Sequence, residues 1–378
     1  MIEKWVQQVW KRPWRSAARG LLTMILGAGM LVAGGCEKGQ ESPGDSAGTT
    51  PGAAGGEWRL AGAFSSTLPL MGESGVRVGE AVARISGGRL RLTYLEPGTA
   101  GPVLEIFNAV GRGDVEAGWG TAAFWSEQVP AAAFFTAVPF GPDTNEFLAW
   151  LYHGGGLELW RELYFGHNVH PLPCGAIPPE AGGWFREPLA KPEQLKGRKI
   201  RFFGLGGQAL QKLGASVLNL DGGDLYAALE RGVLDGSEFS LPLIDQKAGF
   251  GKVAKYYQFP GWHQQTSLLE LIVNRERWTA LPEADRLLLE TVCRASIVET
   301  LAEGEASQRA ALTALRQEGV EVNYWSDEML QAFKRAYEEV VQEMSAKDEP
   351  FRRTHDSYLK FREGYKEWAK LSRLPPGY

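Results

Sequence analysis

The sequence predicts an α/β protein, and three observations support this prediction. Apolar, β-prone stretches alternate with helical stretches from residue 57 to about residue 240, at the spacing that crossover helices require. Helical patterns then dominate from about Glu283 to the end, interrupted by one strand-like stretch. The chain has 378 residues, of which 44% are hydrophobic and 22% charged, so it can bury a large core and suggests about two domains.

The first 36 residues have the layout of an export signal. Basic residues precede the apolar segment GLLTMILGAGMLVAGG, which ends directly before Cys36. The apolar run is shorter than the ~20 residues that a membrane-spanning helix needs. Ala33-Gly34-Gly35-Cys36 resembles a bacterial lipobox, although Leu is usual where Ala33 stands. We therefore expect a periplasmic protein that is lipid-anchored through Cys36, with simple secretion as the alternative.

Residues 37–56 have the composition of a flexible linker, with almost nothing to bury. GDSAG, at residues 44–48, matches the G-x-S-x-G motif of serine hydrolases, but neither a strand nor a helix flanks it. We interpret this match as chance. The folded domain is accordingly assigned to residues 57–378.

The elements of this domain follow from its residue patterns. Strands are expected at EWRLAGAF, RLRLTYL and VEAGWG, with helices between them at GVRVGEAVARI and PVLEIFNAV. NEFLAWLYHGGGLELWRELYF is helical, and CGAIPPEAGGWFREP is a hinge or loop. Further strands are expected at KIRFF, SVLNLD, SLLELIVN and VEVNYW. A long helix covers about residues 283–318, and Ser326 can N-cap the helical C-terminal segment.

Charge and cysteine usage narrow the function classes. The formal net charge is -5, and Lys and Arg are dispersed among acids, which gives no basic surface for nucleic acid. His167, His170 and Cys174 could suit zinc, but no second ligand cluster accompanies them, and we interpret them as ordinary side chains. Cys174 and Cys293 could form one disulfide; we favour two buried free thiols.

GRKIRFFGLGGQALQKLGA, residues 197–215, raises the question of a dinucleotide site. Gly204, Gly206 and Ala209 fit G-x-G-x-x-A, and Asp221 or Asp224 follows at about the expected ~20 residues. About 140 residues of α/β pattern precede the motif, however, and the helix expected over residues 208–213 is short for binding a pyrophosphate. A periplasmic NAD-linked oxidoreductase using this loop is therefore the alternative hypothesis.

Arg201, in the strand before these glycines, offers a different anion site. Its guanidinium could clamp a ligand carboxylate or pair with a nearby acid, and sequence alone does not separate the two. Glu180, Glu238 and Glu270 lie among apolar or small residues, where carboxylates are rarely buried unless paired or metal-bound. Such a cluster could bind a hard cation, pair Arg201 or act as acid and base, but no Ser/Cys–His arrangement indicates catalysis.

Several long collinear stretches resemble one family. LEIFNAVGRGDVEAGWG, GGWFREPL and LKGRKIRFFGLGGQALQKLGASVLNLDGGDLYAALERGVLDGSEF are similar to the extracytoplasmic solute-binding proteins of TRAP transporters, the DctP type. Within them, the chain resembles the branch that binds 2-oxo and 2-hydroxy acids such as pyruvate or lactate. The resemblance covers about residues 57–370. It implies a two-lobed, periplasmic-binding-protein-like fold with connecting strands and a long helix. It further implies delivery of the ligand to the permease membrane subunits, without enzymatic chemistry.

The resemblance also implies the roles of individual residues. Arg201 matches the carboxylate-binding arginine, Glu238 and the Phe239 carbonyl match the cation and ligand positions, and Glu270 matches a glutamate near the pocket. Glu180 stands where relatives carry Gln, so the second carboxylate should favour calcium over sodium. No organic cofactor is implied.

Aromatic side chains complete the expected site, with Phe124, Phe239 and Trp262 closing its walls. Ala123 and Phe124 stand where relatives have Tyr, and the lost hydroxyl suggests a more apolar carboxylic acid. A stripe on the last helix permits a homodimer or packs on its own domain (Tyr358, Phe361, Tyr365, Trp368, Leu371). A ligand-sensing subunit is a third hypothesis.

Overall fold

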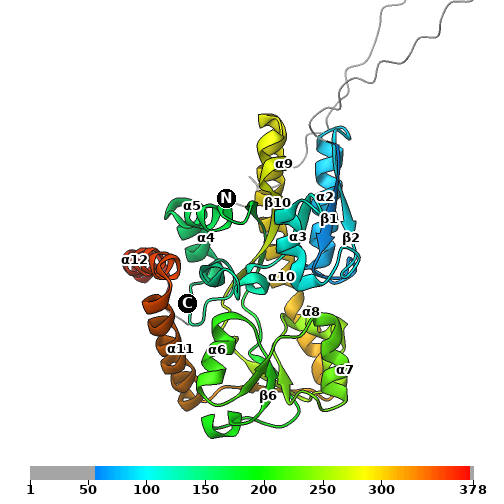
Figure 1. The fold of residues 1–378 in the computed structure, drawn as a ribbon. Coiled ribbons are helices and arrows are strands. Elements are labelled where there is room, and N and C mark those ends of the chain that lie inside the picture. Colours follow the sequence, from blue (N-terminus) through cyan, green and yellow to red (C-terminus); the bar gives the residue numbers. More distant parts are fainter. Residues whose placement is uncertain (1–55, 375–378) are drawn as a thin grey trace, which may run out of the picture. The chain divides into compact units, whose positions relative to one another are not determined.

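The computed structural model describes residues 56–374, which form two β-sheets with helices packed around them (Figure 1). The expected export signal, Cys36, the linker up to residue 55 and the GDSAG motif lie outside the described residues. No helix in the described part of the chain is long and apolar enough to cross a membrane. The predicted α/β class is confirmed.

The first sheet has five strands in the order β2-β1-β3-β10-β4. β1 pairs in parallel with β2 and β3, as the alternation of strands and helices predicted. β10 is antiparallel to both of its neighbours. The strands are β1 (Gly56–Gly62), β2 (Leu90–Leu95), β3 (Ala117–Gly120), β4 (Val169–Ile177) and β10 (Ser267–Asn274).

β4 was not predicted as a strand, because Pro171 and Pro173 interrupt its pattern. It lies at the edge of the sheet and pairs with β10 on one side only. Proline, which lacks an N–H donor, is tolerated at such an edge. The expected hinge or loop, residues 174–188, therefore contains the end of this strand and a second short strand at Gly183–Phe185.

The second sheet has six short strands in the order β11-β9-β5-β8-β6-β7. β6 is parallel to β7 and β8, whereas β5 is antiparallel to β8 and β9. The strands are β5 (Gly183–Phe185), β6 (Lys199–Arg201), β7 (Ser216–Leu218), β8 (Gly236–Ser237), β9 (Tyr256–Phe259) and β11 (Glu321–Tyr324). Two apolar clusters, separate from the core of the first sheet, pack around these strands.

Most helices agree with the predicted pattern, but the helix at residues 242–248 was not predicted, and the helical stretch expected over residues 145–165 forms two helices. Ser326 caps the helix that begins at Asp327 by accepting a hydrogen bond from Met329 N. The helices are α2 (Gly72–Ile85), α3 (Ile106–Arg112), α4 (Thr144–His153), α5 (Gly156–Phe165), α6 (Gly204–Lys212), α7 (Leu225–Glu230), α8 (Pro242–Ala248), α9 (Arg275–Ala280), α10 (Glu283–Gln317), α11 (Asp327–Lys347) and α12 (Glu349–Ser372). α10 contacts β4, and its Leu315 belongs to an apolar cluster of the second sheet, so this helix bridges the two sheets. On α12, Tyr358 is buried, whereas Trp368 is 60% and Leu371 76% exposed.

The expected loop of glycines before α6 is instead the first turn of that helix, which begins at Gly204. Gly204 has φ +61°, a conformation that favours glycine. A Cβ on Gly207 would lie 2.9 Å from the carbonyl oxygen of Phe202, closer than real Cβ contacts. The glycines therefore allow the chain to turn tightly from β6 into α6.

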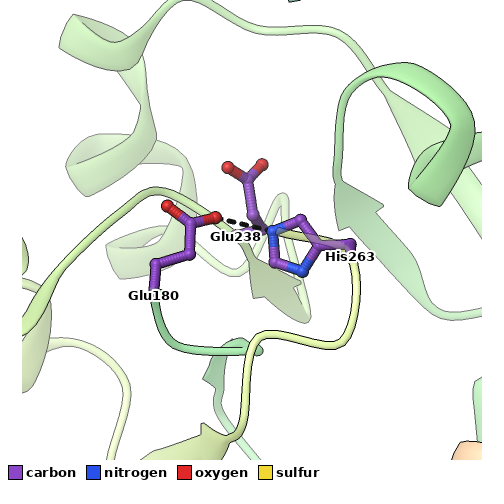
Figure 2. Close-up of side chains that lie close together, drawn as sticks. All are labelled: Glu180, Glu238 and His263. Carbon is purple, nitrogen blue, oxygen red and sulfur yellow. Dashed lines mark hydrogen bonds and ion pairs between the residues drawn. The ribbon is translucent and has the colours of Figure 1, made fainter. Parts of the chain in front are cut away.

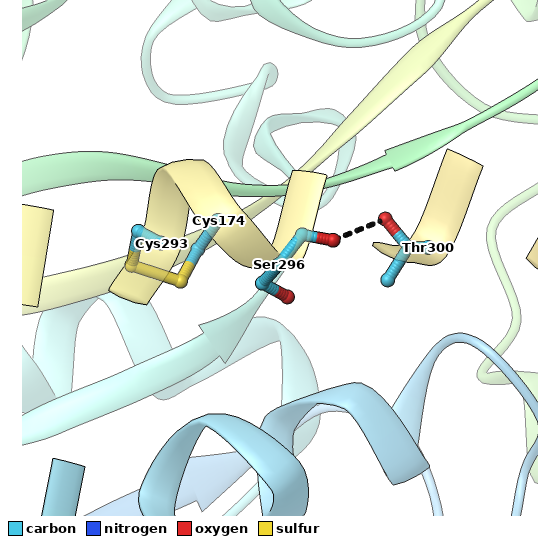
Figure 3. Close-up of a disulfide and its surroundings, with 4 residues drawn as sticks. All are labelled: Cys174, Cys293, Ser296 and Thr300. Carbon is cyan, nitrogen blue, oxygen red and sulfur yellow. Dashed lines mark hydrogen bonds between the residues drawn. A yellow bond between two sulfur atoms is a disulfide. The ribbon is translucent and has the colours of Figure 1, made fainter. Parts of the chain in front are cut away.

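Cys174 and Cys293 form a disulfide (Figure 3), so the expectation of two free thiols was wrong. β4 packs directly on α10, which places the two Cα atoms 4.0 Å apart although 119 residues separate them in sequence. Thr300 on the same helix accepts a hydrogen bond from Ala176 N at 2.8 Å. Cys174 is thus not available for zinc, and His170 stacks on Trp278 instead.

The chain crosses between the sheets through two short segments, residues 178–182 after β4 and residues 260–266 before β10. The segments lie side by side. Gly261 N donates to the Glu180 carbonyl oxygen at 2.8 Å, and Glu180 N donates to that of Gln264 at 3.4 Å. We call this pair of segments the crossover pair. Through it the chain passes from the first sheet and its helices, the first lobe, to the second sheet and its helices, the second lobe, and back.

Candidate functional site

A cleft between the two sheets is lined by residues from both lobes. The second sheet contributes most of the charged groups, and the first contributes mainly apolar side chains. The residues used below are Phe64, Met71, Val103, Ala123, Phe124, Arg201, Phe203, Asp221, Glu238, Phe239, His263, Gln264, Ser267 and Leu269. Arg201, Glu238, Phe239 and Phe124, predicted from sequence, therefore line one cleft.

Arg201 ends β6 and is 3% exposed, with its guanidinium in the cleft wall. Its Nη1 donates to Glu238 Oε2 at 2.6 Å and to the Glu238 carbonyl oxygen at 2.8 Å. The guanidinium also lies over the ring of Phe203, 4.1 Å from its centroid. The structure is therefore compatible with both interpretations of Arg201 made from the sequence. It pairs with an acid, and it still faces the cleft, where it could clamp a ligand carboxylate.

Glu180, Glu238 and His263 converge at the edge of this cleft (Figure 2). Each offers one ligand atom, and these atoms lie within 4.8 Å of one another. Glu180 and His263 belong to the crossover pair, and Glu238 follows β8. Glu180 Oε1 is 2.7 Å from His263 Nε2, and its Oε2 accepts from Gln264 Nε2 at 2.6 Å.

Acidic side chains outnumber basic ones in and around this cluster. Burial raises the pKa of Glu180 well above its ordinary value, and the negative charges of Glu238 and Asp245 raise it further. Burial also raises the pKa of Glu238, against the opposing effect of Arg201. His263 is neutral, because burial lowers its pKa to about 3. A cation fits this donor set, since carboxylate oxygens are the ligands that calcium and sodium prefer.

Three predicted site residues do not line the cleft: Glu180, which lies beside it in the cluster with Glu238 and His263, and Trp262 and Glu270, which belong neither to the lining nor to the cluster. Trp262 instead stacks on Phe333, at 4.3 Å between ring centroids, within a core cluster of the second lobe. Glu270 is fully buried on β10, where its Oε1 accepts from Trp125 Nε1 at 2.6 Å and from Tyr164 at 3.3 Å. Because side chains alternate along a strand and Ser267 and Leu269 face the cleft, Glu270 points away from it.

Sequence reasoning missed His263 and Gln264, as well as Phe64, Met71 and Val103 in the apolar wall. The two polar residues follow Gly261-Trp262 in the crossover pair, and only the position of Glu180 in space gives them a role. Asp221, one of the two acids that follow the glycine motif, also lines the cleft. Burial raises its pKa, and the positive charge of Arg201 opposes this increase. Gly204 of the motif and Asp221 thus belong to the same cleft as Glu238.

A protein-family model confirms the resemblance on independent grounds. Residues 64–348 match the DctP model, described as bacterial extracellular solute-binding protein, family 7. The monocarboxylate 2-oxoacid-binding periplasmic protein of Nostoc sp. is 34% identical over 297 residues, which cover 79% of this chain and 82% of that protein.

Solved structures agree with this match. A TRAP transporter solute-binding protein from Bordetella bronchiseptica, with copurified calcium and picolinate, has a TM-score of 0.82 and 30% identity, covering 84% of this chain and 95% of its own. A homologous protein from Pseudoalteromonas atlantica, with bound sodium and pyruvate, has a TM-score of 0.81 and 31% identity, covering 84% and 97%. The cations and carboxylates in these structures are of the chemistry that the cluster of Glu180 and Glu238 suits.

Proposed function

Because the chain belongs to the DctP family of bacterial extracellular solute-binding proteins, we propose that it binds a 2-oxo or 2-hydroxy monocarboxylate together with a cation. It then delivers this ligand to the membrane permease of a TRAP transporter. The observation that carries this proposal is that Arg201 and Glu238 line one cleft and that Glu180 converges with Glu238 beside it. Members of the family are substrate-binding receptors rather than enzymes, so the oxidoreductase hypothesis is abandoned.

Arg201 would hold the ligand carboxylate. Within the described structure its Nη1 and Nε are engaged by protein acceptors, Glu238 and the Leu220 carbonyl oxygen. Nη2 is then the nitrogen best placed to donate to a ligand. A guanidinium suits this role because it stays charged even when burial lowers its pKa, as it does here.

Glu180, Glu238 and the carbonyl oxygen of Phe239 would hold the cation. A carboxylate with a neighbouring 2-oxo or 2-hydroxyl oxygen chelates a cation through both groups, which favours these acids over simple carboxylates. Arg201 neutralises one of the two glutamates, and the ligand adds one more negative charge. Among these groups a divalent ion balances the two remaining charges, whereas sodium leaves one uncompensated. The nearby acids Asp221 and Asp245 act in the same direction, so we favour calcium.

The apolar wall would contact the side chain of the ligand. Phe64, Met71 and Val103 line the cleft on the side of the first sheet, and Ala123 and Phe124 offer no hydroxyl there. A side chain larger and more apolar than the methyl group of pyruvate would bury its surface against this wall. We therefore favour an aliphatic or aromatic 2-oxo acid as the ligand.

Location and assembly follow the same proposal. The protein would act in the periplasm, and lipid on Cys36 would anchor it to a membrane. The exposed Trp368 and Leu371 on α12 support a homodimer through the C-terminal helices. Mass spectrometry of the mature N-terminus tests the lipid, and sedimentation tests the dimer.

Native mass spectrometry of the purified protein, with and without EDTA, tests the central proposal. We expect a bound mass that corresponds to a cation plus a small carboxylic acid, and loss of the acid when EDTA removes the cation. Calorimetry with calcium chloride and pyruvate then measures both affinities. A protein that binds neither the cation nor any 2-oxo acid contradicts the proposal.

A further inference from the structure

Asp245, at the start of α8, is a buried carboxylate next to the cation cluster but outside it. It is 1% exposed. Its Oδ2 accepts from Trp184 Nε1 and from the Tyr257 hydroxyl, both at 2.7 Å, and its Oδ1 accepts from Ser240 N at 3.0 Å. Trp184 and Tyr257 are paired in register on β5 and β9, and their rings stack at 3.8 Å. The carboxylate is therefore fixed to the second sheet.

Ser240 connects this carboxylate to both segments that carry the proposed ligands of the cation. It follows Glu238 and Phe239 directly in sequence, so its N–H fixes the end of that segment. Its carbonyl oxygen accepts from Ala181 N at 3.4 Å, one residue after Glu180. A shift of Ser240 would thus move the carboxylates of Glu180 and Glu238 relative to each other.

The chemistry of Asp245 also argues against a purely structural role. All three of its donors are neutral groups, and an ionised carboxylate with neutral partners in a dry interior costs free energy that an uncharged side chain would avoid. Burial, together with the negative charge of Glu238, raises the pKa of Asp245 to about 7. A cation nearby would favour the ionised form, whose charge adds to those of Glu180 and Glu238.

We propose that Asp245 is a positioning residue of the cation site, which aligns the Glu180 and Glu238 segments through Ser240 and adds negative charge behind them. This inference rests on the proposed function, because it presumes that the cluster binds a cation. Partners of metal ligands act in this way in other proteins, where their removal weakens metal affinity about 10- to 100-fold.

The test measures calcium affinity in Asp245→Asn by calorimetry with calcium chloride, after EDTA treatment and at a fixed pyruvate concentration. Asp285→Asn is the matched control. Asp285, at the start of α10, is also a buried carboxylate, but it pairs with Arg89. Melting temperatures in EDTA report the structural effect of each substitution. We expect about 10- to 100-fold weaker calcium binding in Asp245→Asn only.

Tyr257→Phe keeps the inference testable if Asp245→Asn does not fold, because it removes one donor and leaves the carboxylate in place. We expect it to bind calcium more weakly than the wild type does. If Asp245→Asn, or Tyr257→Phe in its absence, binds calcium like the wild type and only melts earlier in EDTA, Asp245 is structural and the inference is wrong. If the wild type itself binds no calcium, the proposed function fails first.

Discussion

Arg201 reaches Glu238 through a single nitrogen, Nη1, which donates both to the carboxylate at 2.6 Å and to the carbonyl oxygen at 2.8 Å. One guanidinium therefore holds the side chain and the backbone of the same residue. This contact orients the Glu238 carboxylate while the remainder of the guanidinium faces the cleft. A substitution of either residue should therefore change the environment of both charges.

Replacing Arg201 with Lys should weaken pyruvate binding about 10- to 100-fold, because an ammonium keeps the charge but loses the fork that binds Glu238 and the ligand together. Calorimetry measures the change. Arg198→Lys is the control, since Arg198 pairs with Glu187 near the surface and away from the cleft. Equal affinity of Arg201→Lys and the wild type would rule out the clamp.

Replacing Glu180 with Gln should weaken calcium binding about 10-fold or more and leave sodium binding less affected, because one of two buried carboxylates is neutralised. The same change should raise the melting temperature in EDTA, since burial and nearby acids disfavour ionised Glu180. Glu187→Gln is the surface control. A variant with unchanged preference for calcium over sodium contradicts the assignment.

The apolar wall predicts that affinity rises with the size of the ligand side chain. Each added methylene should strengthen binding by up to about 0.8 kcal/mol from pyruvate to 4-methyl-2-oxopentanoate. Ala123→Tyr should reduce this gain by filling the wall next to Phe124. 4-Methylpentanoate, which lacks the 2-oxo group, is the control ligand. A series in which pyruvate binds most tightly would refute this preference and leave the cation site intact.

Glu270 should make the fold less stable as pH rises. Burial raises its pKa to about 8, so the folded state binds its proton more tightly than the unfolded state does. The resulting stability is fully present below the ordinary value of 4.5 and is lost as pH rises through 8. The free energy of unfolding of the wild type should fall by on the order of 3 kcal/mol from pH 5 to pH 8 because of this group, and Glu270→Gln should lack this fall. Urea unfolding measures both pH profiles. Parallel pH profiles of the two proteins would show that Glu270 is not responsible.

The disulfide between Cys174 and Cys293 should stabilise the fold without affecting the ligand. Loss of a bond that closes a loop of 119 residues should cost about 4 to 5 kcal/mol in a chain-entropy estimate. Denaturant unfolding of Cys174→Ala/Cys293→Ala against the wild type measures the cost. Calorimetry with pyruvate should give an unchanged affinity, and a large change would mean that the bond also shapes the cleft.

Sequence patterns predicted most of the helices and parallel strands because these elements depend on local periodicity. They failed where the tertiary context decides. β4 is a strand despite two prolines because it lies at an edge, and Cys174 meets Cys293 only through packing of that strand on α10. Arg201 and Glu238 were found because their motifs are contiguous. His263 and Gln264 could not be, because they act through Glu180, 83 and 84 residues away.

The crossover pair has a mechanical consequence. Any rotation of one sheet relative to the other must bend the segments that carry Glu180 and His263, since these segments join the sheets. Together with α10, which also bridges the two sheets, these segments form the pivot, so the proposed cation site lies within part of it. A bound cation would stiffen these joining segments rather than draw together two separate surfaces. A permease that separates the lobes would therefore also distort the cation site and weaken binding of the ligand.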